Sequence, residues 1–232
     1  MGKRIIQQAR GKGSKTYRVR RKAYSLKIGY SAKTGEGEII KLIHSAGHSA
    51  PLMKLKIGNE IFYNPAFNGS YVGQKIFLGE SGEIKEGNIL DLRNIPVGTR
   101  VYNIERNPGD GGKFIRTGGS SASITKKTEN NVFVMMPSKK EIGFNPNCKT
   151  TIGTIAGGGR IEKPFVSAGK KYYKMKARNK LWPRTSAVKM NAVDHPFGSG
   201  RGKRIKSKIA KRNAPPGRKV GHLRPRQTGK RK

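Results

Sequence analysis

Short apolar runs recur through the middle of the chain, and Gly, Asn and Pro separate them. They occupy residues 39–43, 52–57, 75–78, 100–104, 131–135 and 150–155. Runs of this length that are rich in β-branched and aromatic residues are typical of strands, and turn residues between them favour hairpins. The pattern therefore predicts a mainly β fold made of small antiparallel barrels.

The segment from residue 34 to residue 168 has room for two such barrels of about 60 to 75 residues each. We place their boundary at the start of residues 91–168, where a strand-like stretch runs into a Pro-Gly turn. The predicted domains are then residues 1–33, 34–90, 91–168 and 169–232. Residues 17–28 are expected to continue as the first strand of the first barrel. One short helix is predicted over residues 168–180, and Pro183 limits its extent.

Charge divides the chain in the same way. Residues 1–33 hold 11 Lys and Arg and no acid, residues 34–168 hold 17 against 12 acids, and residues 169–232 hold 22 against Asp194 alone, which gives +11, +5 and +21. Charge needed only for solubility would mix the two signs. The many positive charges in each terminal segment repel one another, and such segments become ordered when they bind a polyanion. We therefore predict a nucleic-acid partner. A membrane surface is not expected, since neither end has a large apolar helical face.

Composition narrows the remaining classes. No apolar run approaches the roughly 18 residues that a bilayer-spanning helix needs, and the first residues lack the apolar core of a secretory signal. Cys148 is the only cysteine. It allows no internal disulfide framework, suits a reducing compartment and is interpreted as a small buried hydrophobe.

Glycine clusters lie beside basic residues at 109–113, 118–119, 157–160 and 198–204. Glycine lets a backbone come close to phosphates while a neighbouring cation contacts the oxygens, but it also serves tight turns between strands. The turn is the favoured interpretation at 118–119. Phosphate contact is favoured at 198–202, where no strands flank the cluster. None of the clusters has the ending of a nucleotide-binding P-loop.

A metal site is not predicted. His44 and His48 have the spacing of two ligands on a helix, but Gly47 and Pro51 oppose a helix there. A closed zinc site needs four ligands, and the one cysteine is far away in the sequence.

Asp194 and His195 are adjacent and could suggest a hydrolytic dyad, because a carboxylate can orient an imidazole for base chemistry. Adjacent side chains rarely point at one another in extended backbone, and Pro196 keeps His195 out of helical geometry. The neutral string around them is interpreted as a turn that packs into a nucleic-acid crevice, approached by the flanking cations.

The string Met-Asn-Ala-Val-Asp-His-Pro-Phe-Gly at residues 190–198 and the string Arg-Asn-Ala-Pro-Pro-Gly-Arg-Lys-Val-Gly at residues 212–221 resemble the L-two family of large ribosomal subunit proteins. Residues 44–52, 94–99 and 107–113 match the same family in the same order, so the resemblance covers nearly the whole chain. In the bacterial branch a second His stands at the position of Phe197. The resemblance is therefore to the archaeal and eukaryotic form.

The resemblance implies an oligonucleotide-binding-type (OB-like) barrel, then an SH3-like barrel, with long basic extensions threaded into large-subunit ribosomal RNA. It also implies a cytoplasmic ribosomal protein with ribosomal-protein neighbours and with contact to the small subunit through an intersubunit bridge. Roles in transfer RNA placement and in support of the peptidyl transferase centre follow from the family. No cofactor is expected apart from Mg²⁺ associated with the RNA.

In this family the RNA is regarded as the catalyst, so no enzymatic activity is expected. His195 of the Val-Asp-His-Pro motif is the residue once proposed to act in the chemistry, and we assign it a positioning role. We expect Asp194, His195, Pro196 and Phe197 to lie near the peptidyl transferase centre.

The cations expected on RNA phosphates are Arg18, Arg20, Arg21, Lys22, Arg160, Arg201, Lys203, Arg204, Arg212, Arg218, Lys219 and Arg226. The alternative function is a chromatin-type protein that compacts DNA through basic tails, because phosphate attraction is common to both. Nonspecific compaction requires neither two barrels nor a neutral turn, and those features favour the ribosomal interpretation.

Overall fold

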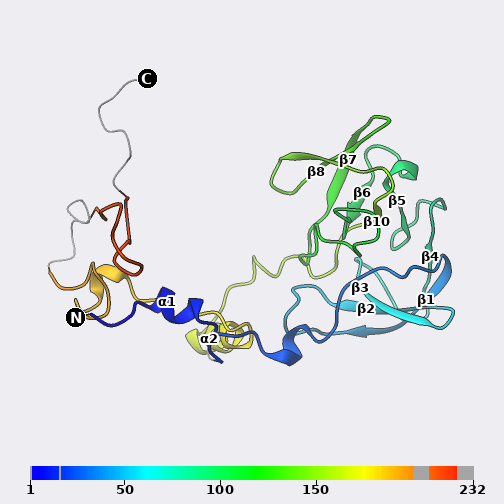
Figure 1. Cartoon of the computed structure of the whole chain (residues 1–232). Helices are drawn as coiled ribbons and strands as arrows, with labels where there is room; N and C mark the ends of the chain where they lie inside the picture. Colours follow the sequence, from blue (N-terminus) through cyan, green and yellow to red (C-terminus); the bar gives the residue numbers. More distant parts are fainter. Residues whose placement is uncertain (1, 16, 201–208, 224–232) are drawn as a thin grey trace, which may run out of the picture. The chain divides into compact units, whose positions relative to one another are not determined.

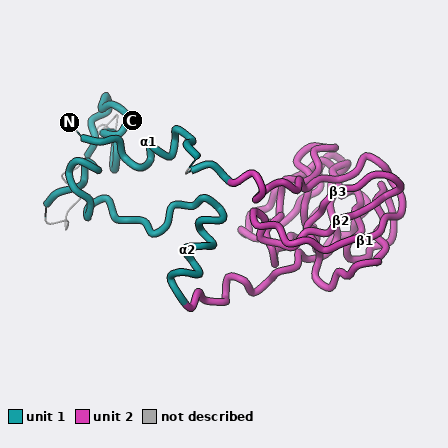
Figure 2. The backbone as a smooth tube through the Cα atoms, turned by 90° about the horizontal axis from the view of Figure 1, so that it is seen from below, with its two compact units in different colours: residues 1–19, 167–232 teal, residues 20–166 magenta. Residues whose placement is uncertain are grey.

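The computed structural model of the chain describes residues 2–15, 17–200 and 209–223. The chain forms two compact units, which Figure 2 shows in different colours. Residues 20–166 are here called the β unit, and residues 1–19 with residues 167–232 are called the terminal unit. The second unit thus combines the two ends of the chain.

The β unit contains a ten-stranded sheet in the order β3-β2-β1-β4-β5-β10-β6-β7-β8-β9. Neighbouring strands run antiparallel, except for the single parallel pairing of β4 with β5. The strands are β1 (Gly35–Ile43), β2 (Leu52–Ile57), β3 (Glu60–Pro65), β4 (Lys75–Leu78), β5 (Ile89–Asp91), β6 (Arg100–Tyr102), β7 (Ala122–Lys127), β8 (Val132–Met135), β9 (Glu141–Phe144) and β10 (Lys149–Ile152) (Figure 1). The predicted mainly β class is confirmed.

Two apolar cores meet at strands β5 and β6. Successive side chains of a strand point to opposite faces, so each of the two strands contributes residues to both cores. Ile89 and Tyr102 pack into a core with residues from β1 to β4, whereas Leu90 and Val101 pack into a core with residues from β7 to β9. The short central strands are therefore buried on both faces and form the wall between the two cores.

A buried polar network crosses between these two halves of the β unit. The Tyr30 hydroxyl donates to the backbone oxygen of Asn103 at 2.6 Å and lies 2.9 Å from Thr151 Oγ1. Asn64 Nδ2 donates to the same Thr151 oxygen, and Asn103 Nδ2 donates to Asn64 Oδ1, both at 2.8 Å. Burial raises the pKa of Tyr30 far above its ordinary value. Since polar groups buried this deeply need their partners, the network holds the two halves in one orientation.

The prediction of a strand over residues 17–28 is wrong. Arg21–Tyr24 forms the 3₁₀ turn η1, and Ile28 pairs with Tyr63 only as an isolated bridge. Ala23 is buried, and its backbone oxygen accepts a hydrogen bond from Gly47 N–H at 2.8 Å. This long-range bond, which the local pattern does not reveal, draws the segment into a turn.

The sequence pattern missed four strands and one helix. β5 has three residues, and β3, β7 and β9 mix their apolar residues with Glu, Lys, Asn or Gly, so none of them forms an obvious apolar run. The predicted helix is present as α2 (Ala168–Ala177), whereas the six-residue α1 (Ile6–Gly11) was not expected. No helix in the described part of the chain is both long and apolar enough to span a bilayer.

Candidate nucleic-acid interface

The Val-Asp-His-Pro-Phe-Gly string forms a closed turn in the terminal unit. Backbone N–H groups of Asp194 and His195 both donate to Asn191 O, at 3.0 and 3.2 Å, and Gly198 N–H donates to His195 O at 2.8 Å. A Cβ at Gly198 would lie 2.2 Å from Asn191 O. Only glycine fits where the turn closes, so the turn is a built structure that presents a fixed surface.

The hydrogen bonding of His195 argues against a hydrolytic dyad. Its Nδ1 accepts a hydrogen bond from Phe197 N–H at 3.0 Å, which places the proton of the neutral ring on Nε2. A carboxylate that orients a catalytic imidazole accepts from Nδ1–H, and that arrangement is absent at this ring. Asp194 Oδ1 instead lies 4.0 Å from Lys3 Nζ. The described contacts of the turn are therefore packing contacts and do not form a hydrolytic dyad.

The N-terminal segment packs against this turn. Lys3 N–H donates to Val193 O at 2.8 Å, and Ile5 is buried. A cavity of about 740 Å³ lies between residues 2–8 and residues of the C-terminal segment, including Pro216 and Gly217. The two ends of the chain, predicted from the sequence as separate extensions, thus have parts in one compact unit.

A second cavity, of about 490 Å³, shares Pro196, Pro215 and Arg218 with the first. Its apolar wall includes Phe197, Ile209 and Val220, and Lys211 and Arg218 also line it. Gly221 lets the chain pass close to the Phe197 ring, since a Cβ there would lie 2.4 Å from that ring's Cζ. The terminal unit therefore contains a cavity with an apolar wall that cations also line.

Most of the cations expected on RNA are exposed in the described residues. Arg160 is half-buried, and Arg18, Arg20, Arg21, Lys22, Arg212, Arg218 and Lys219 are exposed. Within the described residues none of these eight forms an ion pair. Arg201, Lys203, Arg204 and Arg226 lie outside the described residues. The seven exposed cations among them are thus accessible to a polyanion.

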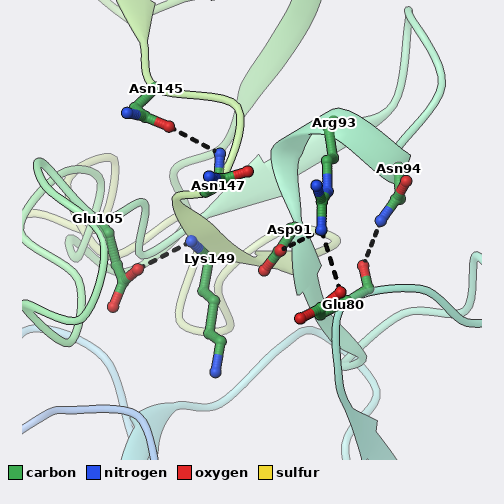
Figure 3. A network of polar contacts seen from close by, with 8 residues as sticks. All are labelled: Glu80, Asp91, Arg93, Asn94, Glu105, Asn145, Asn147 and Lys149. Carbon is green, nitrogen blue, oxygen red and sulfur yellow. Dashed lines mark hydrogen bonds and ion pairs between the residues drawn. The ribbon is translucent and has the colours of Figure 1, made fainter.

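The glycine loop at residues 107–113 holds carboxylates of its own chain. Glu105 is almost fully buried and accepts hydrogen bonds from the backbone N–H groups of Gly109, Gly111 and Lys149, at 2.9 to 3.2 Å. Asp110 accepts further N–H bonds from Arg106, Asn107 and Gly112. Figure 3 shows Glu105 pointing at the backbone of Lys149. These amides are occupied, so the loop is a structural anchor and not a phosphate cradle.

A smaller carboxylate group lies near this anchor in Figure 3. Arg93 Nη2 is 3.0 Å from Glu80 Oε2 and 3.7 Å from Asp91 Oδ2, and Asn94 Nδ2 donates to the Glu80 backbone oxygen. Burial raises the pKa of Asp91 above its ordinary value, partly opposed by Arg93. Arg93 therefore forms ion pairs with carboxylates of its own chain.

The clusters at residues 118–119 and 157–160 approach each other. A Cβ at Gly119 would lie 2.5 Å from Gly158 Cα, and Gly119 N–H donates to Ile155 O at 3.0 Å. The favoured interpretation of residues 118–119 as a tight turn is confirmed, with close backbone packing as the added reason for glycine. At the last cluster only residues 198–200 are described.

His48 belongs to a packing contact. Its Nδ1 lies 2.7 Å from Ser45 Oγ, and its ring meets Tyr24 edge-on at 5.2 Å between centroids. Partial burial lowers the pKa of His48 first, and the Arg116 charge lowers it further. Residues 44–50 are not helical, and no group of His, Cys, Asp and Glu in the described residues could hold a metal ion.

Cys148 is fully buried, and burial raises its pKa to about 11. We expect Cys148 to resist thiol reagents in the folded protein at neutral pH and to react within the mixing time in denaturant. Ellman's reagent added to the native and the urea-unfolded chain measures this. Rapid stoichiometric reaction of the native chain would contradict the burial.

None of the RNA-binding residues predicted from the sequence lies in α2. The helix carries the exposed rings of Tyr172 and Tyr173 among lysines, followed by Trp182. The local signal was present, because paired aromatic residues inside a basic segment are typical of single-stranded nucleic-acid binding.

Comparison with known proteins gives one consistent result. The family model described as "Ribosomal Proteins L2, C-terminal domain" matches residues 85–217. The chain is 48% identical to the large ribosomal subunit protein uL2 of Archaeoglobus fulgidus over 238 residues, covering 100% of both chains. The proteins of the same name from Methanococcus maripaludis and Methanococcoides burtonii are 45% and 44% identical, again over 100% of both chains.

Proposed function

Because the chain belongs to the L2 family of large ribosomal subunit proteins, in its archaeal type, we propose that its two charged ends anchor it in large-subunit ribosomal RNA. It is a structural constituent of the large subunit, as the motifs at residues 190–198 and 212–221 predicted. Ribosomal RNA and other ribosomal proteins are its partners, in the cytoplasmic ribosome. Its role is structural rather than that of a classical enzyme.

The observation that carries the proposal is the segregation of charge between the two units. Of 50 Lys and Arg, the terminal unit holds 28, six in residues 1–19 and 22 in residues 167–232, but of 13 acids it holds only Asp194. Cations at this density repel one another in a compact state. Phosphates of closely packed RNA strands remove that repulsion and release counterions, which supplies the binding free energy.

The contacts follow from the shape of RNA. A-form helices hide their base edges in a deep groove, so proteins bind their phosphates, 2′-hydroxyls, loops and junctions. Arg18, Arg20 and Arg21 at one end, and Arg212, Arg218 and Lys219 at the other, are exposed for backbone contacts. An Arg can direct two parallel N–H groups to one phosphate, whereas a Lys acts as a point charge.

The turn at residues 194–197 is assigned to the neighbourhood of the peptidyl transferase centre. Its hydrogen-bonded backbone and the Phe197 N–H bond to His195 support a positioning role without proton transfer. RNA performs the chemistry in this proposal, and the chain has no catalytic activity of its own. Placement of transfer RNA and an intersubunit bridge to the small subunit complete the assigned roles.

The β unit is assigned an OB-like barrel over residues 34–90 and an SH3-like barrel over residues 91–168. Support comes from the two apolar cores, because the first draws mainly on residues 39–89, with Tyr102 and Ile155 added, and the second draws on residues 90–152. Residues 1–33 and 169–232 are the basic RNA-binding segments in this assignment, and Mg²⁺ enters only with the RNA.

Ultraviolet crosslinking in cells, followed by sequencing of the attached RNA, tests the proposal. We expect reads to concentrate at a few sites of large-subunit ribosomal RNA, including its catalytic domain. Reads spread over messenger RNA, or strong crosslinks to DNA in place of RNA, would overturn the proposal in favour of another polyanion, such as that of a chromatin-type protein.

A further inference from the structure

α2 has well-formed ends. At its start, Ser167 Oγ accepts a hydrogen bond from Lys170 N–H at 3.5 Å. At its end, Asn179 takes a positive φ of 48°, its N–H donates to Lys176 O, and Lys180 N–H donates to Met175 O at 2.9 Å. This pair of bonds is the usual way to satisfy the last carbonyls of a helix. The local sequence therefore specifies where α2 begins and ends.

The interior of α2 does not stabilise it in isolation. Ten residues are fewer than the roughly 12 to 15 at which isolated helices become marginally stable. Lys170 and Lys171 lie at the positive end of the helix dipole, and Lys170 repels Lys174 one turn away. No residue of the helix is fully buried, although several are half-buried, so packing against the chain offsets only part of these costs. An anionic partner outside the chain would reverse each of the unfavourable charge terms.

The surface of α2 combines cations with exposed aromatic rings. Residues 169–189 contain eight Lys and Arg and no acid. Tyr173 is 70% exposed and lies edge-on to Tyr172, with 5.5 Å between centroids. Lys171 Nζ is 5.4 Å from the centroid of Trp182. Flat rings among phosphate-binding cations are what a single strand of nucleic acid requires, because every base has a face that can stack.

We propose that α2 together with Trp182 binds unpaired bases of RNA, with Tyr173 and Trp182 stacking on bases and the neighbouring lysines contacting phosphates. Stacking requires bases that have left the A-form stack, so the substrate is a loop, bulge or single strand. The inference rests on the proposed RNA-binding function and adds the kind of RNA that this helix takes.

Trp182 is the only tryptophan of the chain, so its fluorescence reports on this site alone. The full-length protein would be titrated with a single-stranded RNA of about 12 nucleotides, a length within the range of known single-strand sites, and with a blunt duplex of the same length. We expect the single strand to quench Trp182 and to protect it from acrylamide. The duplex should leave acrylamide access nearly unchanged. Equal effects of both RNAs, or no effect of either at saturation, would overturn the inference.

Two matched substitutions separate stacking from charge. Tyr173→Leu keeps an apolar side chain and a good helix former but removes the ring, and should weaken single-strand binding about 5- to 150-fold at every salt concentration. Lys170→Gln should instead reduce the slope of log affinity against log salt by about 0.7, the effect of one phosphate contact on a single strand. A Tyr173→Leu protein that binds like the parent would refute the stacking role.

A gel-shift assay on the same samples distinguishes a failure of the α2 inference from a failure of the proposed RNA-binding function. If the chain binds RNA tightly and salt-dependently while Trp182 stays unaffected, the inference on α2 fails and the proposed function stands. If the chain binds neither RNA, both fail.

Discussion

Removing residues 198–232 is expected to leave the β unit folded and to prevent stable incorporation into the large subunit. The deletion removes 14 of the 50 Lys and Arg of the chain. If roughly 10 to 15 phosphates are neutralised by the whole protein, its affinity falls by about 7 to 13 decades per decade of salt. The truncated chain should show a much shallower salt dependence and far weaker binding at physiological salt.

The deletion should also loosen the turn at residues 194–197. Ser199 N–H, which donates to Met190 O at 3.1 Å, is lost together with the segment that packs against Gln8 and Phe197. The two cores of the β unit and the residues packed against them lie within residues 30–156, so their packing is unaffected. Circular dichroism during thermal unfolding would follow the β unit, and sedimentation of ribosomal particles would follow incorporation.

A charge-only variant serves as the control. Replacing Arg212, Arg218 and Lys219 with Gln keeps the chain length and the backbone of the terminal unit, and these side chains are exposed. It should lower the salt slope by about 2 to 3 while the particle still accepts the protein, since each lost phosphate contact changes the slope by about 0.7 to 0.9. Normal incorporation of the truncated chain would contradict the anchoring role of the C-terminal segment.

Replacing Glu105 with Ala is expected to destabilise the β unit by about 3 to 5 kcal/mol, because the half-buried N–H groups of Gly111 and Lys149 lose a charged acceptor and each such hydrogen bond contributes about 1.5 to 3 kcal/mol. The substitution removes the acceptor for Gly109, Gly111 and Lys149 at once. The effect lies well above that of ordinary surface substitutions, and it should appear as a lower urea midpoint with a similar slope. Equilibrium unfolding in urea measures it.

Two further substitutions make the test specific. Glu129→Ala changes the same residue type at an exposed position and should stay within about 0.5 kcal/mol of the parent. Glu105→Gln keeps the shape and one acceptor oxygen but turns an NH₂ group toward backbone donors, and it should fall between the two. Equal stability of Glu105→Ala and Glu129→Ala would mean that water replaces the carboxylate without cost.

The local pattern predicted strands that are rich in apolar residues and missed strands that form only because a neighbouring strand pairs with them. β2 and β4 were visible as runs of apolar residues, whereas β9, with the sequence Glu-Ile-Gly-Phe, is a strand because β8 pairs with it. For residues 17–28 the local pattern predicted a strand that does not form, since a hydrogen bond from Gly47 N–H to Ala23 O overrides their local preference. Tertiary context decides such short segments, because their own propensities differ little.

By itself the sequence determined the segregation of charge, the mainly β character, the family and the polyanionic partner, because these depend on composition and on motifs that are local in the chain. Only the tertiary structure decided that Lys3 meets Val193 and that Glu105 occupies the amides of a glycine loop that could otherwise have held phosphate. It likewise decided that no residue of α2 is buried. The physical reason is that hydrogen bonds and burial depend on which distant residues the folded backbone brings together, and a local pattern does not record those pairings.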